Sequence, residues 1–190
     1  MRAKSTWILI VFTICITLVI PASILADTNA ILANIKLANT RDDLLTYFDI
    51  ENAFSEKMIQ AVQNGVPTTF SLYVSLYKTS DAWLDKKIAD TLVKSQIKYN
   101  SLKKEYTISR PWKDNKPMVT TSFDEAQSWM TEVDNLRVSP LDSLVKGEKY
   151  QIRIKVELDK VTLPLFLHHV LFFVSFWDFE TDWYLVNFTY

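Results

Sequence analysis

Two long stretches of the chain alternate strictly between apolar and polar positions. In residues 150–158 the apolar positions are Ile152, Ile154, Val156 and Leu158. In residues 68–78 they are Phe70, Leu72, Val74 and Leu76. A period of two predicts β-strands that each turn one face toward a core. We therefore expect these two rows of side chains to meet in a shared dry interior.

Further segments carry weaker strand patterns. Residues 31–37 place Ile31, Ala33, Ile35 and Leu37 on one face, and residues 44–50 follow after the charged turn 41–43, which predicts a hairpin. Residues 86–99 are rich in β-branched side chains, and residues 102–110 can pair with them across a short connection. An aromatic segment, residues 183–190, ends the chain. These segments predict additional antiparallel strands.

Two short helices are expected between the strands. Asn52 and Ser55 are both candidate N-caps for the first, which Gly65 and Pro67 would end. The second begins with a capping box, Ser122 and Glu125. Its apolar positions follow at helical spacing and are Ala126, Trp129, Met130 and Val133. Residues 136–146, which contain Pro140, are expected to be irregular.

This order of elements predicts a mainly β protein, an antiparallel β-sandwich with two long strands in each sheet and two short inserted helices. The alternative is an α+β arrangement, in which a single sheet carries both helices on one face. About 164 residues remain after the N-terminal segment 1–26, which suits one domain over residues 27–190.

The N-terminal segment has the anatomy of an export signal. Arg2 and Lys4 precede an apolar stretch, residues 7–20, and Pro21 and the small Ala26 precede Asp27. We expect cleavage after Ala26 and export to the periplasm. An uncleaved segment tethering the protein to the inner membrane is the alternative.

The charge balance argues against a nucleic-acid partner, and the cysteine content argues against a disulfide or a catalytic thiol in the exported chain. The chain has 21 Lys and Arg against 22 Asp and Glu, and loss of Arg2 and Lys4 leaves 19 against 22, a net charge of −3. Nucleic-acid binding relies on clustered basic residues, so no nucleic-acid partner is expected. The one cysteine, Cys15, lies in the signal. The exported chain would therefore hold neither a disulfide nor a thiol nucleophile.

Candidate catalytic and ligand-binding groups are sparse. The two histidines, His168 and His169, are adjacent and lie in an apolar segment, and no Gly-x-Ser-x-Gly motif accompanies them. Two isolated glycines cannot form a phosphate loop. Asp178, Glu180 and Asp182 could share one face and attract calcium, but an outward polar face is the simpler interpretation. We predict no catalytic residues, no cofactor, no metal site and no enzyme activity.

The apolar segment from Leu163 to Trp177, called here the connector, is unusual for a link between strands. Leu, Phe, Val and Trp fill 11 of its 15 positions, and it is too short to span a bilayer. It could be core of the sandwich or an exposed apolar lip that contacts a membrane protein or an apolar ligand. The predicted contact residues are Leu165, Phe166, Leu167, His168, His169, Leu171, Phe172 and Phe173.

Several motifs occur together along the chain. They are Gly65-Val66-Pro67, Trp83-Leu84-Asp85, Tyr99 with Leu102 and Tyr106, Leu158-Asp159, Leu163-Pro164 and Trp177-Asp178-Phe179. In their order they resemble the bacterial DUF4390 family, a domain of unknown function, over most of residues 30–190. The resemblance implies an exported envelope protein of Gram-negative-type bacteria with no assigned activity. It also implies an association with membrane sensor histidine kinases. This chain departs from the family at Phe166–Phe173, which is unusually apolar.

Three functions remain open from the sequence. The first is a non-enzymatic periplasmic or envelope binding domain, a signalling accessory that contacts a membrane sensor kinase. The second is a carrier or sensor of an apolar, lipid-like ligand held between sheet and connector. The third is an envelope hydrolase that would use His168 or His169, although no nucleophile and base are paired by spacing.

Overall fold

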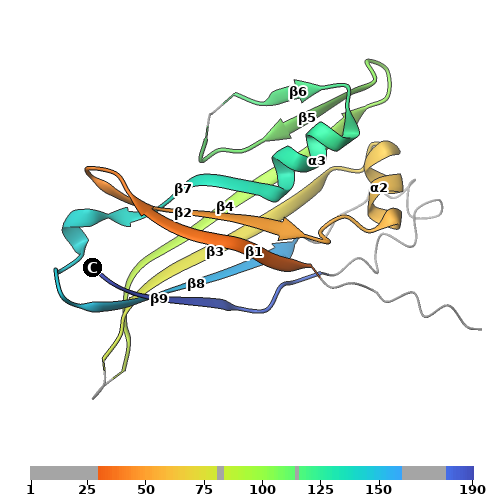
Figure 1. The fold of residues 1–190 in the computed structure, drawn as a ribbon. Helices are drawn as coiled ribbons and strands as arrows, with labels where there is room; N and C mark the ends of the chain where they lie inside the picture. Colours follow the sequence, from red (N-terminus) through yellow and green to blue (C-terminus); the bar gives the residue numbers. More distant parts are fainter. Residues whose placement is uncertain (1–29, 81–83, 114–115, 160–178) are drawn as a thin grey trace, which may run out of the picture.

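The computed structural model describes residues 30–80, 84–113, 116–159 and 179–190. The predicted signal, residues 1–26, and the connector lie outside these ranges. The elements, drawn in Figure 1, are β1 (Ile31–Asn39), β2 (Asp43–Glu51), α2 (Glu56–Gln63), β3 (Thr68–Lys78), β4 (Lys86–Asn100), β5 (Glu105–Ser109), β6 (Met118–Thr120), α3 (Phe123–Thr131), β7 (Glu132–Pro140), the short 3-10 helix η1 (Leu141–Ser143), β8 (Lys149–Leu158) and β9 (Tyr184–Thr189).

Within the described residues the strands form two antiparallel sheets. The small sheet has three strands in the order β1-β2-β7, and the large sheet has six in the order β6-β5-β4-β3-β8-β9. The small sheet lies across one face of the large one, with β7 against β3 and β4 (Figure 1). The predicted mainly β sandwich with two inserted helices is confirmed. The expectation of two long strands per sheet was wrong, because β4 to β6 and β9 extend the large sheet on both sides of β3 and β8.

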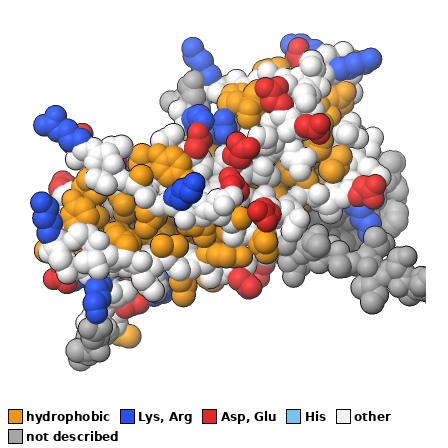
Figure 2. Space-filling view, in the orientation of Figure 1, with side chains coloured by type: hydrophobic (Ala, Val, Ile, Leu, Met, Phe, Trp, Pro, Cys, Tyr) orange, Lys and Arg blue, Asp and Glu red, His pale blue; other side chains and the backbone are white. Residues whose placement is uncertain are grey.

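One long side of the sandwich is bordered by the edge strands β1 and β9, and we call it the open side. Because β7 lies over β3 and β4, the order of the small sheet brings β1 to the side of β9. Figure 2 shows apolar side chains gathered along this side. Ile35 and Leu37 of β1 and Tyr184 and Phe188 of β9 are half-buried and pack against the core.

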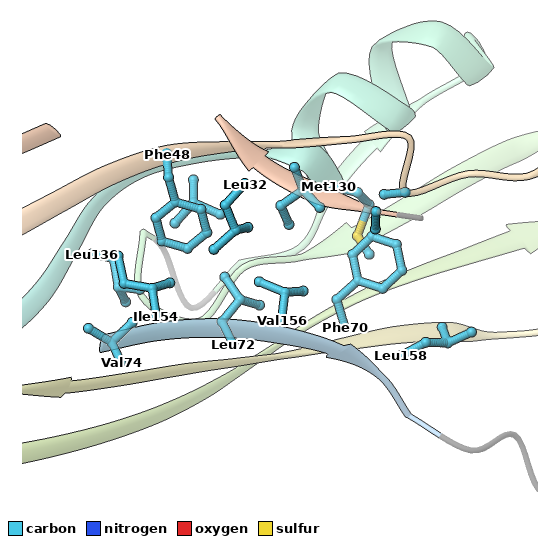
Figure 3. Close-up of a cluster of buried hydrophobic side chains, with 14 of the residues drawn as sticks. Leu32, Phe48, Phe70, Leu72, Val74, Met130, Leu136, Ile154, Val156 and Leu158 are labelled. Carbon is cyan, nitrogen blue, oxygen red and sulfur yellow. The ribbon is translucent and has the colours of Figure 1, made fainter. Parts of the chain in front are cut away.

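The core lies between the two sheets, as the two alternating rows predicted. Both rows on β3 and β8 are at most 5% exposed, and they meet Leu32, Phe48 and Leu136 of the small sheet (Figure 3). The register aligns the rows directly, with Leu72 opposite Val156 and Val74 opposite Ile154. Burying each such side chain contributes about 1.5–3 kcal/mol. The β3–β8 pair is therefore the centre of the fold.

Serine caps begin both α-helices. The Ser55 hydroxyl accepts the Met58 amide at 3.3 Å, so Ser55 and not Asn52 caps α2. The Ser122 hydroxyl accepts the Glu125 amide at 3.3 Å and caps α3. Only half of the expected capping box forms. The Glu125 carboxylate accepts the hydroxyl of Thr120 instead of the Ser122 amide, and that amide donates to Thr120 Oγ1 at 3.1 Å.

The expectation that residues 136–146 are irregular was wrong for their first part. The helix ends at Thr131, and β7 begins at the next residue and runs to Pro140. Val133, expected on the helix, is therefore a buried strand residue. Asn135, at φ 55°, interrupts the alternation and hides the strand pattern. Pro140 is tolerated because β7 is an edge strand and Pro140 is its last residue.

The first strand was predicted correctly, but its inward face was not. Asn34 has φ 53°, and the register with β2 shifts between Ala33 and Lys36. Before this bulge the even-numbered side chains point to the core, and after it the odd-numbered ones do. Leu32 is therefore buried and Ile31 exposed before the bulge, while the residues after it follow the expected face.

Candidate functional site

The eight contact residues predicted on the connector, Leu165 to Phe173, lie outside the described residues. The candidate site built from the described part of the chain is instead the outer face, which we define as the face of the large sheet that points away from the small sheet. Alternation along β3 brings Ser71, Tyr73, Ser75 and Tyr77 to this face. Both serines are buried, and the tyrosines beside them are half-buried.

Each of these two serines holds an aspartate that is also paired with a lysine. Ser75 Oγ donates to Asp90 Oδ1 at 2.6 Å, and Asp90 Oδ2 lies 2.9 Å from Lys87 Nζ. At the other end of β3, Ser71 Oγ donates to Asp159, whose second oxygen lies 2.6 Å from Lys94 Nζ. The same three residue types therefore occur twice on one face.

The Asp90 cluster positions a charge and does not activate the Ser75 hydroxyl. The Ser75 hydroxyl, and then Lys87, hold the pKa of Asp90 below its ordinary value. A carboxylate with a lowered pKa is a weak base, and a serine nucleophile needs an effective one. Burial, and then Glu157, raise the pKa of Tyr73, so its phenol is neutral at pH 7. Asp90 and Tyr73 therefore act as hydrogen-bonding partners on this face.

Lys155 of β8 holds the neighbouring part of the face together. Its Nζ lies 2.8 Å from Glu157 and 2.7 Å from Glu180, and these carboxylates, Glu157 first, raise its pKa. The same Nζ lies 5.9 Å from the centroid of the Trp183 ring. Glu180, one of the three carboxylates considered for calcium, is thus engaged by a lysine. Among the described residues, no three His, Cys, Asp or Glu side chains gather as a metal site.

A shallow hollow of about 460 Å³ lies on the outer face between Arg153 and Trp183. Arg153 lies over Tyr77, with the guanidinium carbon 4.0 Å from the ring centroid. Arg153 Nη2 donates to Asp85 at 2.6 Å, and Nε donates to Gln151 at 2.7 Å. Trp183 and Leu185 complete the rim and are 50% and 55% exposed. The residues around the hollow are Ser75, Tyr77, Gln151, Arg153, Trp183 and Leu185.

The family model for a domain of unknown function, DUF4390, matches residues 27–187. The chain belongs to the DUF4390 family. Comparisons with curated proteins and with solved structures gave no match. Within the described ranges, no helix has the length and apolar character needed to cross a membrane.

Two residues that carry the resemblance to the DUF4390 family lie on the outer face. Asp85, of the Trp-x-Asp motif, binds Arg153, and Asp159, of the Leu-Asp motif, binds Ser71 and Lys94. Tyr99 and Tyr106, which also carry the resemblance, pack with the core and are aligned across β4 and β5 with ring centroids 4.7 Å apart. Neither Asp85 nor Arg153 was among the contact residues predicted from the sequence. The alternation of serine and tyrosine in residues 71–77 was the available signal for this face.

Proposed function

We propose that this DUF4390 chain is a non-enzymatic binding domain of the bacterial cell envelope that docks a membrane protein through the hollow on its outer face. The observation that carries the proposal is the cluster of Arg153, Tyr77 and Trp183 around the hollow. Arginine, tyrosine and tryptophan are the residue types that dominate binding energy at protein interfaces. Here β3 and β8 hold Tyr77 and Arg153, and Trp183 directly precedes β9, so the three are in place before any partner binds.

The charges around the hollow also suit a protein partner. Arg153, Lys155, Lys87 and Lys94 are each paired with a carboxylate of the same face. A partner therefore meets a surface with little unpaired charge, as in the core of protein interfaces, which is poor in charged residues. The half-exposed Trp183 and Leu185 offer apolar area for one inserted aliphatic or aromatic side chain.

The expected partner is the outward-facing part of a membrane sensor kinase. This choice rests on the export signal expected for residues 1–26 and on the association implied by the resemblance to the family. The protein would then be a signalling accessory in the periplasm, whose rigid sheet recognises the sensor. Rigid presentation limits the entropy lost on binding, which favours a shallow site of this kind.

Photo-crosslinking tests this proposal. A benzophenone amino acid is placed at Trp183 in one variant and, as a control, at Leu102, which is 94% exposed in the turn between β4 and β5. After irradiation of living cells, we expect a product at position 183 whose partner peptide belongs to the outward-facing segment of a sensor kinase. A second substitution, Tyr77→Ala, should remove it. Equal products at both positions, or no product at position 183, would refute the proposal.

The other two functions considered from the sequence gain no support from the described residues. Between the sheets, Phe48, Leu72 and Ile154 are at most 1% exposed and pack directly against neighbouring core residues, so an apolar ligand would need to contact the connector. A hydrolase would need His168 or His169, which also lie outside the described ranges. Both therefore rest on the sequence alone, and the protein-docking proposal is the one that the outer face supports.

A further inference from the structure

The edge strands of the two sheets differ in how well they are protected from pairing with another chain. In the described part of the molecule the edges are β1 and β7 in the small sheet and β6 and β9 in the large sheet. An unpaired edge invites a further strand unless it is short, charged, bulged or interrupted by proline. An edge that carries such protection is expected to remain unpaired, and an edge without it is expected to pair with a further strand.

Three of these edges carry such protection. β6 is only three residues long. β1 has the bulge at Asn34 and carries Lys36 close to it. β7 carries Arg137, ends in Pro140 and shifts register twice against β2. Each edge therefore resists the addition of a strand.

The edge strand β9 lacks every one of these features. Its six residues, Tyr184 to Thr189, include no glycine, proline or charged side chain, and its register with β8 runs without a shift. Among the described residues it pairs only with β8. It also borders the open side, where apolar side chains gather (Figure 2).

The direction of the backbone groups of β9 follows from the pairing with β8. The Tyr190 amide donates to the Glu148 carbonyl at 3.2 Å, on the β8 side. Because backbone groups alternate along a strand, those of Leu185, Asn187 and Thr189 point away from β8. The side chains of these three residues are exposed on the outer face. Each can therefore accept or donate a further ladder bond.

We propose that β9 pairs with β9 of a second copy of this chain, in antiparallel orientation about a two-fold axis. This inference goes beyond the proposed function. Among the registers that match the outward-pointing residues with one another, the two that pair five residues of β9 with five of the other copy are centred on Val186 and on Asn187. In either register no two like charges face each other across the pair, because β9 has no charged residue. The half-buried row of β9, which contains Tyr184 and Phe188, would continue into the same row of the other copy, so pairing extends the apolar surface of the open side across both molecules.

Disulfide formation between copies tests the pairing directly. Val186→Cys and Asn187→Cys are made singly in the full chain carrying Cys15→Ser, which removes the native thiol. Residues that face their own copy across an antiparallel pair have Cα atoms about 4.5–5.5 Å apart, within the range that a disulfide spans. We expect one of the two variants to give a covalent dimer on mild oxidation. Leu102→Cys, in an exposed turn, is the control and should give no covalent dimer.

The mass in solution gives a second, independent readout. Light scattering of the purified chain over a range of concentrations should show twice the monomer mass. Asn187→Pro should lower the dimer fraction at least tenfold, because proline removes an outward N–H and leaves the backbone hydrogen bonds between β8 and β9 intact. Asn187→Lys should act in the same direction through charge on the edge. Leu102→Lys is the charge control.

The outcomes separate this inference from the docking proposal. Circular dichroism and thermal melting identify any variant that fails to fold. A monomer at all concentrations, or a dimer unaffected by both Asn187 variants, would overturn the pairing. Both variants also remove the hydrogen bond that Gln151 Nε2 donates to Asn187 Oδ1 at 2.9 Å beside the docking site. Asn187→Ala, which removes that bond but keeps the outward N–H, is therefore the control: it should stay dimeric, and its photo-crosslink at position 183 is the reference for the docking site.

Discussion

Arg153 and Tyr77 lie on neighbouring strands of the large sheet, and the guanidinium carbon of Arg153 is 4.0 Å from the centroid of the Tyr77 ring. The two residues are diagonal neighbours, because Tyr77 is opposite Gln151 and Arg153 is opposite Ser75. Asp85 and Gln151 fix the guanidinium in this position. The stack is therefore assembled before a partner arrives, and its contribution to binding can be separated from its contribution to folding.

Arg153→Lys should weaken partner binding more than it weakens the fold. A lysine cannot stack over Tyr77 while it also donates to both Asp85 and Gln151 in the fork geometry of arginine. We expect the apparent affinity, measured from the concentration dependence of the photo-crosslink at position 183, to fall about tenfold or more. The free energy of unfolding should fall by less than about 1 kcal/mol, since the ion pair is partly exposed.

Arg137→Lys is the matched control for that change. Arg137 Nε lies 2.7 Å from Asp43 on the small sheet, away from the hollow. The substitution should leave the photo-crosslink unchanged. If Arg153→Lys binds as well as the unaltered chain, the stack is not part of the docking site.

Leu72→Ala tests whether the β3–β8 pair is the centre of the fold. Leu72 is fully buried opposite Val156, and truncation leaves a cavity between the sheets. We expect the free energy of unfolding in urea to fall by about 2–5 kcal/mol. Leu92→Ala, on the neighbouring strand β4 and 53% exposed, should cost less than about 1 kcal/mol. Similar losses for the two variants would contradict the assignment of the core.

Asn34 should tolerate glycine better than a β-branched residue. Its φ of 53° lies in the left-handed region, which glycine adopts freely and which costs other L-residues about 1–2 kcal/mol. Asn34→Gly loses the exposed hydrogen bond to Asp49 but keeps the bulge. Asn34→Val should be less stable than Asn34→Gly by about 1–2 kcal/mol or more, measured by urea unfolding. Equal stability would mean that the bulge is not constrained at this residue.

The sequence predicted the strands whose side chains alternate without interruption. β3 and β8 have unbroken rows of apolar residues at every second position, so their predicted bounds and their predicted buried faces both agree with the structure. β7 was missed and the inward face of β1 was partly misassigned, and in both an asparagine with positive φ shifts the pattern by one residue. A simple count of apolar spacing cannot show where such a bulge lies, because asparagine is equally common in turns.

The candidate site was harder to predict because its parts are distant in the sequence. Asp159 lies 88 residues from Ser71, and Arg153 lies 68 residues from Asp85. Their pairing depends on the register between strands, which no local motif reveals. The connector was predicted as a contact site because its apolar residues lie in one continuous segment of the sequence. The hollow is visible only once β3, β8 and the residues before β9 are side by side.

Asp90 provides a test of the outer face through the pH dependence of stability. The hydrogen bond from Ser75, and then Lys87, lower the pKa of Asp90 in the folded protein. A carboxyl group with a lowered pKa stabilises the fold above its unfolded value of about 3.9, and this contribution is lost as pH falls through the folded value. Asp90→Asn should therefore be less stable than the unaltered chain at pH 7, by no more than about 1 kcal/mol because the ion pair is exposed.

The difference between the two proteins should shrink as the pH falls below about 4, since the unaltered chain then loses the charge that the variant lacks. Urea unfolding of both proteins at pH 7 and at several values below pH 5 measures this difference in the free energy of unfolding. Ser75→Ala should lower stability in the same way at pH 7, because it removes the largest cause of the lowered pKa. A difference that stays constant with pH would show that Asp90 acts by packing alone and that the serine–aspartate–lysine cluster does not hold a charge in place.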